Sequence, residues 1–386
     1  MLKTLLLAAA LVFVVVAAFI VPVGEPLFAR SAAAQGAAAV VPLEGLDPVL
    51  LLQGKEAQGD EAHSVTRGRF RYLFAGAETK AAFEREPARY EIQLGGTCAR
   101  MGPSTQGNPD LYAVHGGRIY LFGSPACAKA FKEGPDKYLE TAGAWAAGGA
   151  SAPTEESRRK GRALVDQAVE AVGGAARLDA LVSYQEKATT SAHSPQGVTE
   201  VKTSLTRVYP GKSREERTLS FGTIATVVTP AGGFFATARG GGDDMIDEQR
   251  AAYEKQFARN VISLLRARRD AGFAASAAGT GKAGETAVEQ VDVSARGSAA
   301  RLGIDPATGR VLSLAYRGRG PGGMFGDIVQ TFSDFRAVEG LTLPFKTAAT
   351  FNGEPSPAHS STVESIVINA PVPPSVFEKS RPAGGQ

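Results

Sequence analysis

Hydrophobic and polar positions follow three different patterns along the chain. Residues 5–20 form an uncharged apolar run, and residues 67–140 combine short aromatic segments with helical spacing. Beyond a stretch rich in Ala and Gly at residues 146–154, apolar and polar residues mostly alternate with a period of two. This alternation is typical of antiparallel strands with one buried and one solvated face. The pattern therefore predicts an α+β protein with two domains joined by a linker at 146–154.

The first domain contains a segment that occurs twice without gaps. Residues 67–92 read RGRFRYLFAGAETKAAFEREPARYEI, and residues 115–140 read HGGRIYLFGSPACAKAFKEGPDKYLE. The shared positions are aromatic residues and turn formers: Gly68/Gly116, Tyr72/Tyr120, Phe74/Phe122, Phe83/Phe131, Pro87/Pro135 and Tyr90/Tyr138. They predict a Gly turn, a short strand, a helix with an inward Phe, and a closing Tyr. Because one such unit cannot bury its apolar face alone, we expect the two copies to pack on each other.

The second domain begins with a helix. Leu164, Ala168 and Val172 recur at four-residue spacing, which predicts one apolar face. Ser157 is the N-cap candidate, and the glycines at 173–174 predict the end of the helix.

Strands separated by turn residues follow. The predicted strands are 200–209, 223–228, 233–238, 287–295, 300–304, 311–317, 328–335, 345–351 and 361–368. In the first of them Leu205, Arg207 and Tyr209 share one face. Residues 305–309 have the Pro and Gly of a hairpin turn. One long helix is predicted over 243–270, with apolar residues on one face. The second domain is therefore expected to be an antiparallel sheet interrupted by a helix.

Motifs in the first domain carry a family resemblance. GLDPV at 45–49, GGTCA at 95–99 and Trp145 accompany the duplicated unit. Over residues 42–145 the chain resembles the YHS family, whose small treble-clef-like modules often bind metal through cysteines. In its metal-binding members one Cys follows the strand and another opens the helix. Here these positions hold Ala75 and Thr79 in the first copy, and Gly123 and Cys127 in the second, so the repeat keeps the folding pattern and one thiol of four.

Motifs late in the second domain carry another resemblance. IDPATG at 304–309, FSDFRAVEGLTLP at 332–344 and the VF pair at 376–377 resemble the outer-membrane lipoprotein-sorting family, the LolA/LolB-like proteins, over residues 155–382. The resemblance implies a half-barrel domain at 155–386, in which a bent sheet wraps around helices and the apolar space between them holds acyl chains. It implies a lipid-like or other apolar cargo, but it assigns no cargo-binding residue. The alternative is that the same apolar faces fill an ordinary core.

The beginning of the chain predicts export. A positive start at Lys3, the apolar run, and the small residues before Gln35 are typical of a secretory signal peptide over residues 1–34. An uncleaved membrane anchor is the alternative, because the apolar run approaches the length that spans a bilayer. Both interpretations place the protein in the periplasm or outside the cell, close to a membrane.

Charge and motif content exclude several classes of function. The net charge of +3 over 386 residues gives no electrostatic reason to expect nucleic-acid binding. The chain has only four His, none in a His-Glu-x-x-His spacing, and no Gly-x-Ser-x-Gly motif. GTGK at 279–282 is interpreted as a plain loop, and GRGPGG at 318–323 as a flexible hairpin tip. We therefore expect a binding protein without catalytic activity.

The two cysteines, Cys98 and Cys127, are the candidate chemistry. In an oxidising compartment they are expected to form a disulfide, which would stabilise the domain by roughly 3 kcal/mol. A second possibility is a copper or zinc site that uses both thiolates together with His115 or His63. A third is two unconnected thiols. The leading hypothesis is a secreted envelope protein that binds apolar cargo, and the alternative is a metal-binding or redox protein acting through its first domain.

Overall fold

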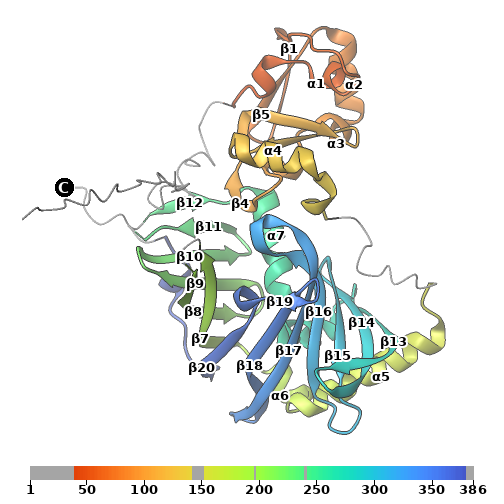
Figure 1. The fold of residues 1–386 in the computed structure, drawn as a ribbon, viewed down its shortest axis with the longest axis vertical. Coiled ribbons are helices and arrows are strands. Elements are labelled where there is room, and N and C mark those ends of the chain that lie inside the picture. Colours follow the sequence, from red (N-terminus) through yellow and green to blue (C-terminus); the bar gives the residue numbers. More distant parts are fainter. Residues whose placement is uncertain (1–38, 141–151, 195–196, 239–240, 380–386) are drawn as a thin grey trace, which may run out of the picture.

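The computed structural model describes residues 39–140, 152–194, 197–238 and 241–379. Figure 1 shows two bodies stacked along the long axis, an N-terminal domain (described residues 39–140) above a sheet domain (described residues from 155 onward). The predicted signal peptide, Trp145 and most of the predicted linker lie outside the described residues. In the part of the chain that is described, no helix is both long and apolar enough to cross a membrane.

The N-terminal domain contains the predicted unit twice. The first copy consists of β1 (Asp60–Arg67), β2 (Phe70–Phe74), α2 (Ala77–Arg85) and α3 (Pro87–Tyr90). The second consists of β5 (Asn108–His115), β6 (Arg118–Phe122), α4 (Pro125–Glu133) and η3 (Pro135–Lys137). Phe83 and Phe131 face inward on their helices and are 0% and 1% exposed. The predicted strand, helix and inward Phe are confirmed in both copies.

The two copies meet at β6. Ile119 and Leu121 of β6 belong to the same core cluster as Phe74 and Phe83 of the first copy, while Phe131 centres a second cluster. The remaining elements are η1 (Leu43–Gly45), α1 (Pro48–Leu51), η2 (Gln93–Gly96), β3 (Thr97–Cys98) and β4 (Gly102–Gln106). The strands of the second sheet lie in the order β4-β3-β6-β5. The expectation that the copies pack on each other is therefore confirmed.

The sheet domain is built on one large antiparallel sheet. Its strands are β7 (Ser183–Ser194), β8 (Gly197–Val208), β9 (Lys212–Leu219), β10 (Gly222–Thr229), β11 (Gly232–Ala236), β12 (Gly242–Asp244), β13 (Ala274–Ala283), β14 (Thr286–Ala295), β15 (Ser298–Ile304), β16 (Val311–Arg319), β17 (Phe325–Val338), β18 (Leu341–Phe351), β19 (Glu354–Pro355) and β20 (Ser361–Ile368). Their order is β12-β11-β10-β9-β8-β7-β20-β18-β17-β16-β15-β14-β13, with β19 beside β18. The strand path ends at β12 and β13, so the sheet is open, and Figure 1 shows that it is bent. A large antiparallel sheet together with a few helices confirms the predicted α+β class.

The last strand joins two meanders. The chain runs from β7 outward to the edge strand β12, then begins again at the opposite edge with β13 and runs inward to β18, and β20 pairs with both β7 and β18. Strands β7, β9 and β13 and the two-residue β19 were not predicted. The GTGK segment at 279–282, predicted to be a loop, lies in β13. That prediction was wrong because the small residues of this strand give a weak β signal.

The helices of this domain are α5 (Glu155–Val172), α6 (Ala175–Asp179), α7 (Asp247–Ala258) and α8 (Val261–Arg266), with short 3₁₀ turns η4 (Ala267–Arg269), η5 (Pro321–Gly323), η6 (Pro357–His359) and η7 (Pro374–Phe377). Thr154, not Ser157, caps α5, since its side chain accepts a hydrogen bond from the Ser157 backbone N–H at 3.1 Å. The helix ends at Gly173 as predicted, with a φ of 133°.

The predicted single helix over 243–270 is wrong. Its first residues pair with β11 as the short strand β12, and the remainder is broken between α7 and α8. Asn260 accounts for the break, because its side chain accepts a hydrogen bond from the Ser263 backbone N–H at 3.0 Å and so begins a new helix. The apolar spacing continued across this break, which is why the sequence suggested one helix.

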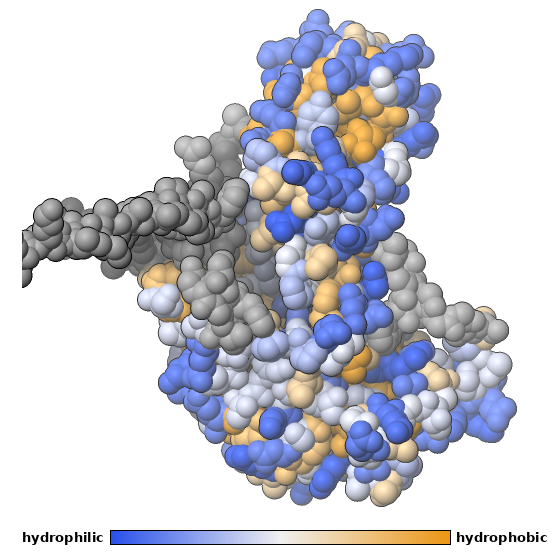
Figure 2. Space-filling view, viewed as in Figure 1, coloured by the Kyte–Doolittle hydropathy of each residue, from blue (hydrophilic) through white to orange (hydrophobic). Residues whose placement is uncertain are grey.

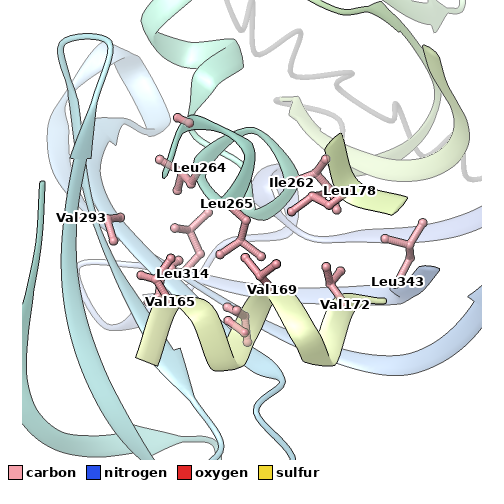
Figure 3. Packing of buried hydrophobic residues seen from close by; sticks show 14 of the residues in the cluster. Val165, Val169, Val172, Leu178, Ile262, Leu264, Leu265, Val293, Leu314 and Leu343 are labelled. Atoms are coloured by element: carbon pink, nitrogen blue, oxygen red, sulfur yellow. The ribbon is translucent and has the colours of Figure 1, made fainter. Parts of the chain in front are cut away.

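Helices α5 and α8 pack on one face of the sheet. Figure 3 shows Val165, Val169 and Val172 of α5 pointing toward Leu264 and Leu265 of α8. Gly161 allows α5 to approach β13 closely, since a Cβ at this position would lie 2.6 Å from backbone atoms of Ser276. The predicted apolar face of α5 is therefore confirmed as part of the main core.

The two domains touch through backbone and side-chain contacts. Arg319, at the end of β16, donates a hydrogen bond to the carbonyl of Arg100 at 3.1 Å. Gln249 of α7 donates to the carbonyl of Pro103 at 2.6 Å, and the Lys255 ammonium lies 2.7 Å from the Glu140 carboxylate. The GRGPGG segment forms the predicted hairpin tip between β16 and β17, and this tip lies against the N-terminal domain.

Candidate functional sites: a cavity in the sheet domain and a pair of cysteines

A cavity of about 240 Å³ lies between the inner face of the sheet and helices α5 and α8. We call it the sheet cavity. Strands β7, β8, β16, β17, β18 and β20 contribute to its wall. Its apolar lining includes Val172, Leu205, Ile262, Leu265, Leu314 and Leu343. On the face seen in Figure 2, the surface of the sheet domain is mostly polar, with scattered apolar residues.

Strand alternation decides which side chains reach the sheet cavity. In the β7–β8 ladder Leu205 is paired with Glu186 and Arg207 with Tyr184. Cross-strand partners point to the same face of a sheet, so an apolar, an acidic, a basic and a phenolic side chain all project inward. The sequence had already placed Leu205 and Arg207 on one face of a strand. An arginine on that apolar face was the available signal for a polar group in the interior.

Tyr184 and Glu186 form a polar pair in the cavity wall. The Tyr184 hydroxyl donates a hydrogen bond to the Glu186 carboxyl. Both side chains are enclosed by protein, yet both keep some accessible surface because they line the cavity. Burial raises the pKa of Glu186 above its ordinary value, against the opposing effects of the Tyr184 hydrogen bond and the charge of Arg207. Burial also raises the pKa of Tyr184. Burial therefore disfavours the ionised form of both groups.

Two arginines bring positive charge to the same cavity. Arg207 is only 8% exposed, its Nη1 donates to the Ser263 hydroxyl at 3.0 Å, and its buried Nε has no hydrogen-bond partner. Arg259 also has a buried Nε without a partner, and its Nη2 lies 3.4 Å from the Glu140 carboxylate of the N-terminal domain. Buried N–H groups are usually paired, so these two Nε groups are exceptions among the residues that the structure describes.

The second candidate site is the cysteine pair. Cys98 ends β3 and Cys127 lies in the first turn of α4, and the fold brings them together in one core cluster. Both are free thiols, 0% and 5% exposed. Three groups surround the sulfur of Cys127: the Cys98 thiol, the Ser124 hydroxyl at 3.3 Å and Arg100 Nη1 at 3.8 Å.

These neighbours make the two thiols unequal. The hydrogen bond from Cys98 lowers the pKa of Cys127 well below that of an ordinary thiol, and the Ser124 hydroxyl and Arg100 act in the same direction against burial. The pKa of Cys98 is raised well above its ordinary value by the same hydrogen bond and by burial. A position at a helix N-terminus also favours a thiolate. Cys127 is therefore the anionic member of the pair and Cys98 the protonated one.

The predicted histidine ligands are not assembled with the cysteines. His115 Nε2 lies 3.5 Å from Asp136, and its ring meets the ring of Phe131 edge-on at 5.9 Å, while His63 lies in β1 of the first copy. Within the described ranges, no group of three or more His, Cys, Asp or Glu side chains is placed to hold a metal ion. Of the predicted site residues, the structure brings together Cys98 and Cys127 alone.

The proteins found to be similar to this chain are solved structures. No family model and no curated protein match the sequence. The structure is similar to a putative outer membrane lipoprotein-sorting protein domain from Vibrio parahaemolyticus, with 10% identity, a TM-score of 0.38, and coverage of 57% of this chain and 97% of that one. It is also similar to a LolA superfamily protein from Nitrosomonas europaea, with 10% identity, a TM-score of 0.39 and the same coverage of 57% and 97%. A DUF1329 family protein from Desulfovibrio piger has 12% identity and a TM-score of 0.34, with coverage of 56% and 96%.

Proposed function

We propose that the sheet domain binds an apolar or amphiphilic ligand in the sheet cavity. The observation that carries this proposal is the cavity itself, about 240 Å³ in volume and lined by aliphatic, aromatic and polar side chains from α5, α8 and the inner face of the sheet. A dry cavity of about 150 Å³ lined by Leu, Ile and Phe is large enough to bind benzene. The sheet cavity can therefore admit a small apolar molecule or part of an acyl chain.

An ordinary packed core explains this region less well than a ligand site does. Protein interiors are packed with few voids larger than a water molecule, and buried polar groups are normally satisfied within the protein. Here an aliphatic space remains, and a buried donor of Arg207 in its wall has no partner. A ligand would fill this space and could offset the charge of Arg207.

A fluorescence titration tests the proposal. The intact protein is titrated with N-phenyl-1-naphthylamine, a neutral dye that fluoresces in apolar surroundings. Leu205→Trp places a large ring at a lining position of β8, so we expect saturable binding to the parent protein and binding at least about tenfold weaker to this variant, in line with 1–3 kcal/mol for overfilling a packed space.

Val367→Trp supplies the matched control. Val367 lies on β20 of the same sheet and is 44% exposed, so the added ring should leave dye binding unchanged. Absence of saturable binding to the parent protein, or equal binding to all three proteins, would contradict the proposal.

A second candidate function is favoured by the cysteine pair. We propose that Cys98 and Cys127 form a reversible dithiol–disulfide couple whose oxidant is a small-molecule disulfide. The Cys127 thiolate attacks one sulfur of the disulfide, forming a mixed disulfide and releasing one thiolate. The Cys98 thiol then loses its proton and attacks the Cys127 sulfur, which releases the second thiolate. Both protein thiols are oxidised, and the small disulfide is reduced to two thiols.

Oxidised glutathione tests the assigned roles. Because Cys127 is the thiolate, Cys98→Ser should trap one glutathione on Cys127, Cys127→Ser should remain unmodified, and the parent protein should lose two hydrogens in intact mass spectra. Cys98→Ser keeps a hydroxyl that can donate to the thiolate, whereas Cys98→Ala does not and should react more slowly at mildly acidic pH.

A different set of products would contradict this second function. An adduct on Cys98 in the Cys127→Ser variant would reverse the roles, and an unmodified parent protein would rule out the couple. Stoichiometric copper or zinc in the purified protein, lost together with both thiolates in a double variant, would favour the metal hypothesis instead.

A further inference from the structure

We propose that the ligand of the sheet cavity is an anionic amphiphile whose oxyanion head group is bound by Arg207. This inference rests on the proposed function of the cavity and adds the chemical class of the ligand. The apolar lining would hold the chain, and one buried guanidinium would select the head group.

The charges that face the cavity favour an anion. The charged lining residues are Arg207, Arg259, Arg310 and Glu186, three cations and one carboxyl group. Glu186 is held in a hydrogen bond by Tyr184, and its burial disfavours the ionised form. A second carboxyl, Glu215 of β9, is the cross-strand partner of Leu205, and burial likewise raises its pKa. Burial therefore disfavours the ionised form of both carboxyl groups near Arg207.

The Arg207 guanidinium makes few hydrogen bonds for a group with five N–H donors. Its one side-chain hydrogen bond to a neighbouring group goes to the neutral hydroxyl of Ser263, and its Nε has none. Arg259 is less suited to hold a ligand alone, because it already lies 3.4 Å from the Glu140 carboxylate. A guanidinium presents parallel N–H groups that match the oxygens of a carboxylate or a phosphate. An oxyanion placed beside Arg207, which lines the cavity, would offset its buried charge.

The position of Arg207 in the wall suits a ligand with two chemically different ends. Arg207 and Leu205 project from the same face of β8, and the apolar side chains Val172, Leu314 and Leu343 line the same cavity. A ligand with a charged end and an aliphatic end can therefore contact both kinds of wall at once. A purely apolar ligand would leave the Arg207 guanidinium with the Ser263 hydroxyl and the face of the Phe257 ring, 6.0 Å from its Cζ, as its partners. Such a ligand would add nothing to offset the buried charge.

Competition experiments on the intact protein test this assignment. Decanoate, decyl phosphate and methyl decanoate are each used at neutral pH to displace N-phenyl-1-naphthylamine from the parent protein and from Arg207→Met. Charged hydrogen bonds contribute enough that we expect the variant to bind the acidic competitors about ten- to a hundredfold more weakly. Methyl decanoate should bind both proteins alike, because it has no negative charge to lose. The acidic competitor that loses more affinity, decanoate or decyl phosphate, shows whether the head group is a carboxylate or a phosphate.

Two further variants separate binding from folding. Arg207→Lys keeps the charge without the planar pair of donors and should restore part of the affinity for the acids. Arg162→Met removes a positive charge from the exposed side of α5 and should behave as the parent protein does. If Arg207→Met weakens the acids and the ester equally, or affects none of them, the head-group assignment fails while the cavity proposal stands. If neither dye nor ester binds the parent protein, the cavity proposal itself fails.

Discussion

At the scale of single residues, three polar side chains in the wall of the sheet cavity carry the functional argument. Tyr184, Glu186 and Arg207 all project from adjacent strands into one cavity. Burying such groups in a domain core costs free energy unless they are paired. Tyr184 and Glu186 pair with each other, whereas Arg207 keeps an unsatisfied Nε. Arg207 is therefore the member of the three that the ligand proposal addresses.

The pH dependence of stability reports on Glu186. Its pKa in the folded protein is raised above the value of 4.5 by burial, so the native state holds the proton more tightly than the unfolded state does. The stabilising contribution is complete below pH 4.5 and is lost as the pH rises through the raised pKa. Glu186→Gln keeps an acceptor for Tyr184 but cannot ionise. We therefore expect the variant to gain free energy of unfolding relative to the parent protein as the pH rises above 4.5.

Denaturant unfolding at a series of pH values measures this effect. Glu364→Gln, at an exposed position of β20, serves as the control and should follow the parent curve. A constant difference between Glu186→Gln and the parent protein at every pH, or a difference that shrinks as the pH rises, would show that Glu186 is not held in its neutral form.

At the scale of elements, local patterns predicted most of the architecture. The duplicated unit was visible because aromatic, Gly and Pro positions recur in register, and both copies fold as that pattern indicates. Most strands of the sheet were visible from their period of two. The apolar face of α5 was visible from Leu164, Ala168 and Val172, all of which are buried. These features depend on residues near one another in sequence.

Elements that depend on distant partners were not predictable in the same way. Strand β13 is rich in small residues, and it is held by pairing with β14 and by the close approach of α5 at Gly161. The break between α7 and α8 depends on the capping side chain of Asn260. A single sequence also does not show which strand faces meet which helices, so the sheet cavity and its residues could not be named in advance. The cysteines were named because their chemistry is visible from residue type alone.

At the scale of the whole molecule, the cysteine pair lies beside the junction of the two domains, and one residue of the sheet-cavity lining, Arg259, reaches that junction. Arg319 of β16 donates to the carbonyls of Ala99 and Arg100, the residues that follow Cys98. Burial lowers the pKa of Arg319 to about 10, which leaves it charged at neutral pH. Arg259 contributes to the wall of the sheet cavity and contacts Glu140 of the N-terminal domain.

The most direct test of the central claim is whether the intact protein carries a ligand in the sheet cavity. The parent protein, Leu205→Trp and Val367→Trp are each incubated with a total lipid and fatty-acid extract, separated from free lipid, and analysed by native mass spectrometry. We predict one bound amphiphile per molecule on the parent protein and on Val367→Trp, and little or none on Leu205→Trp. Recovery of the parent protein without ligand, or of Leu205→Trp with as much ligand as the parent protein, would contradict the account.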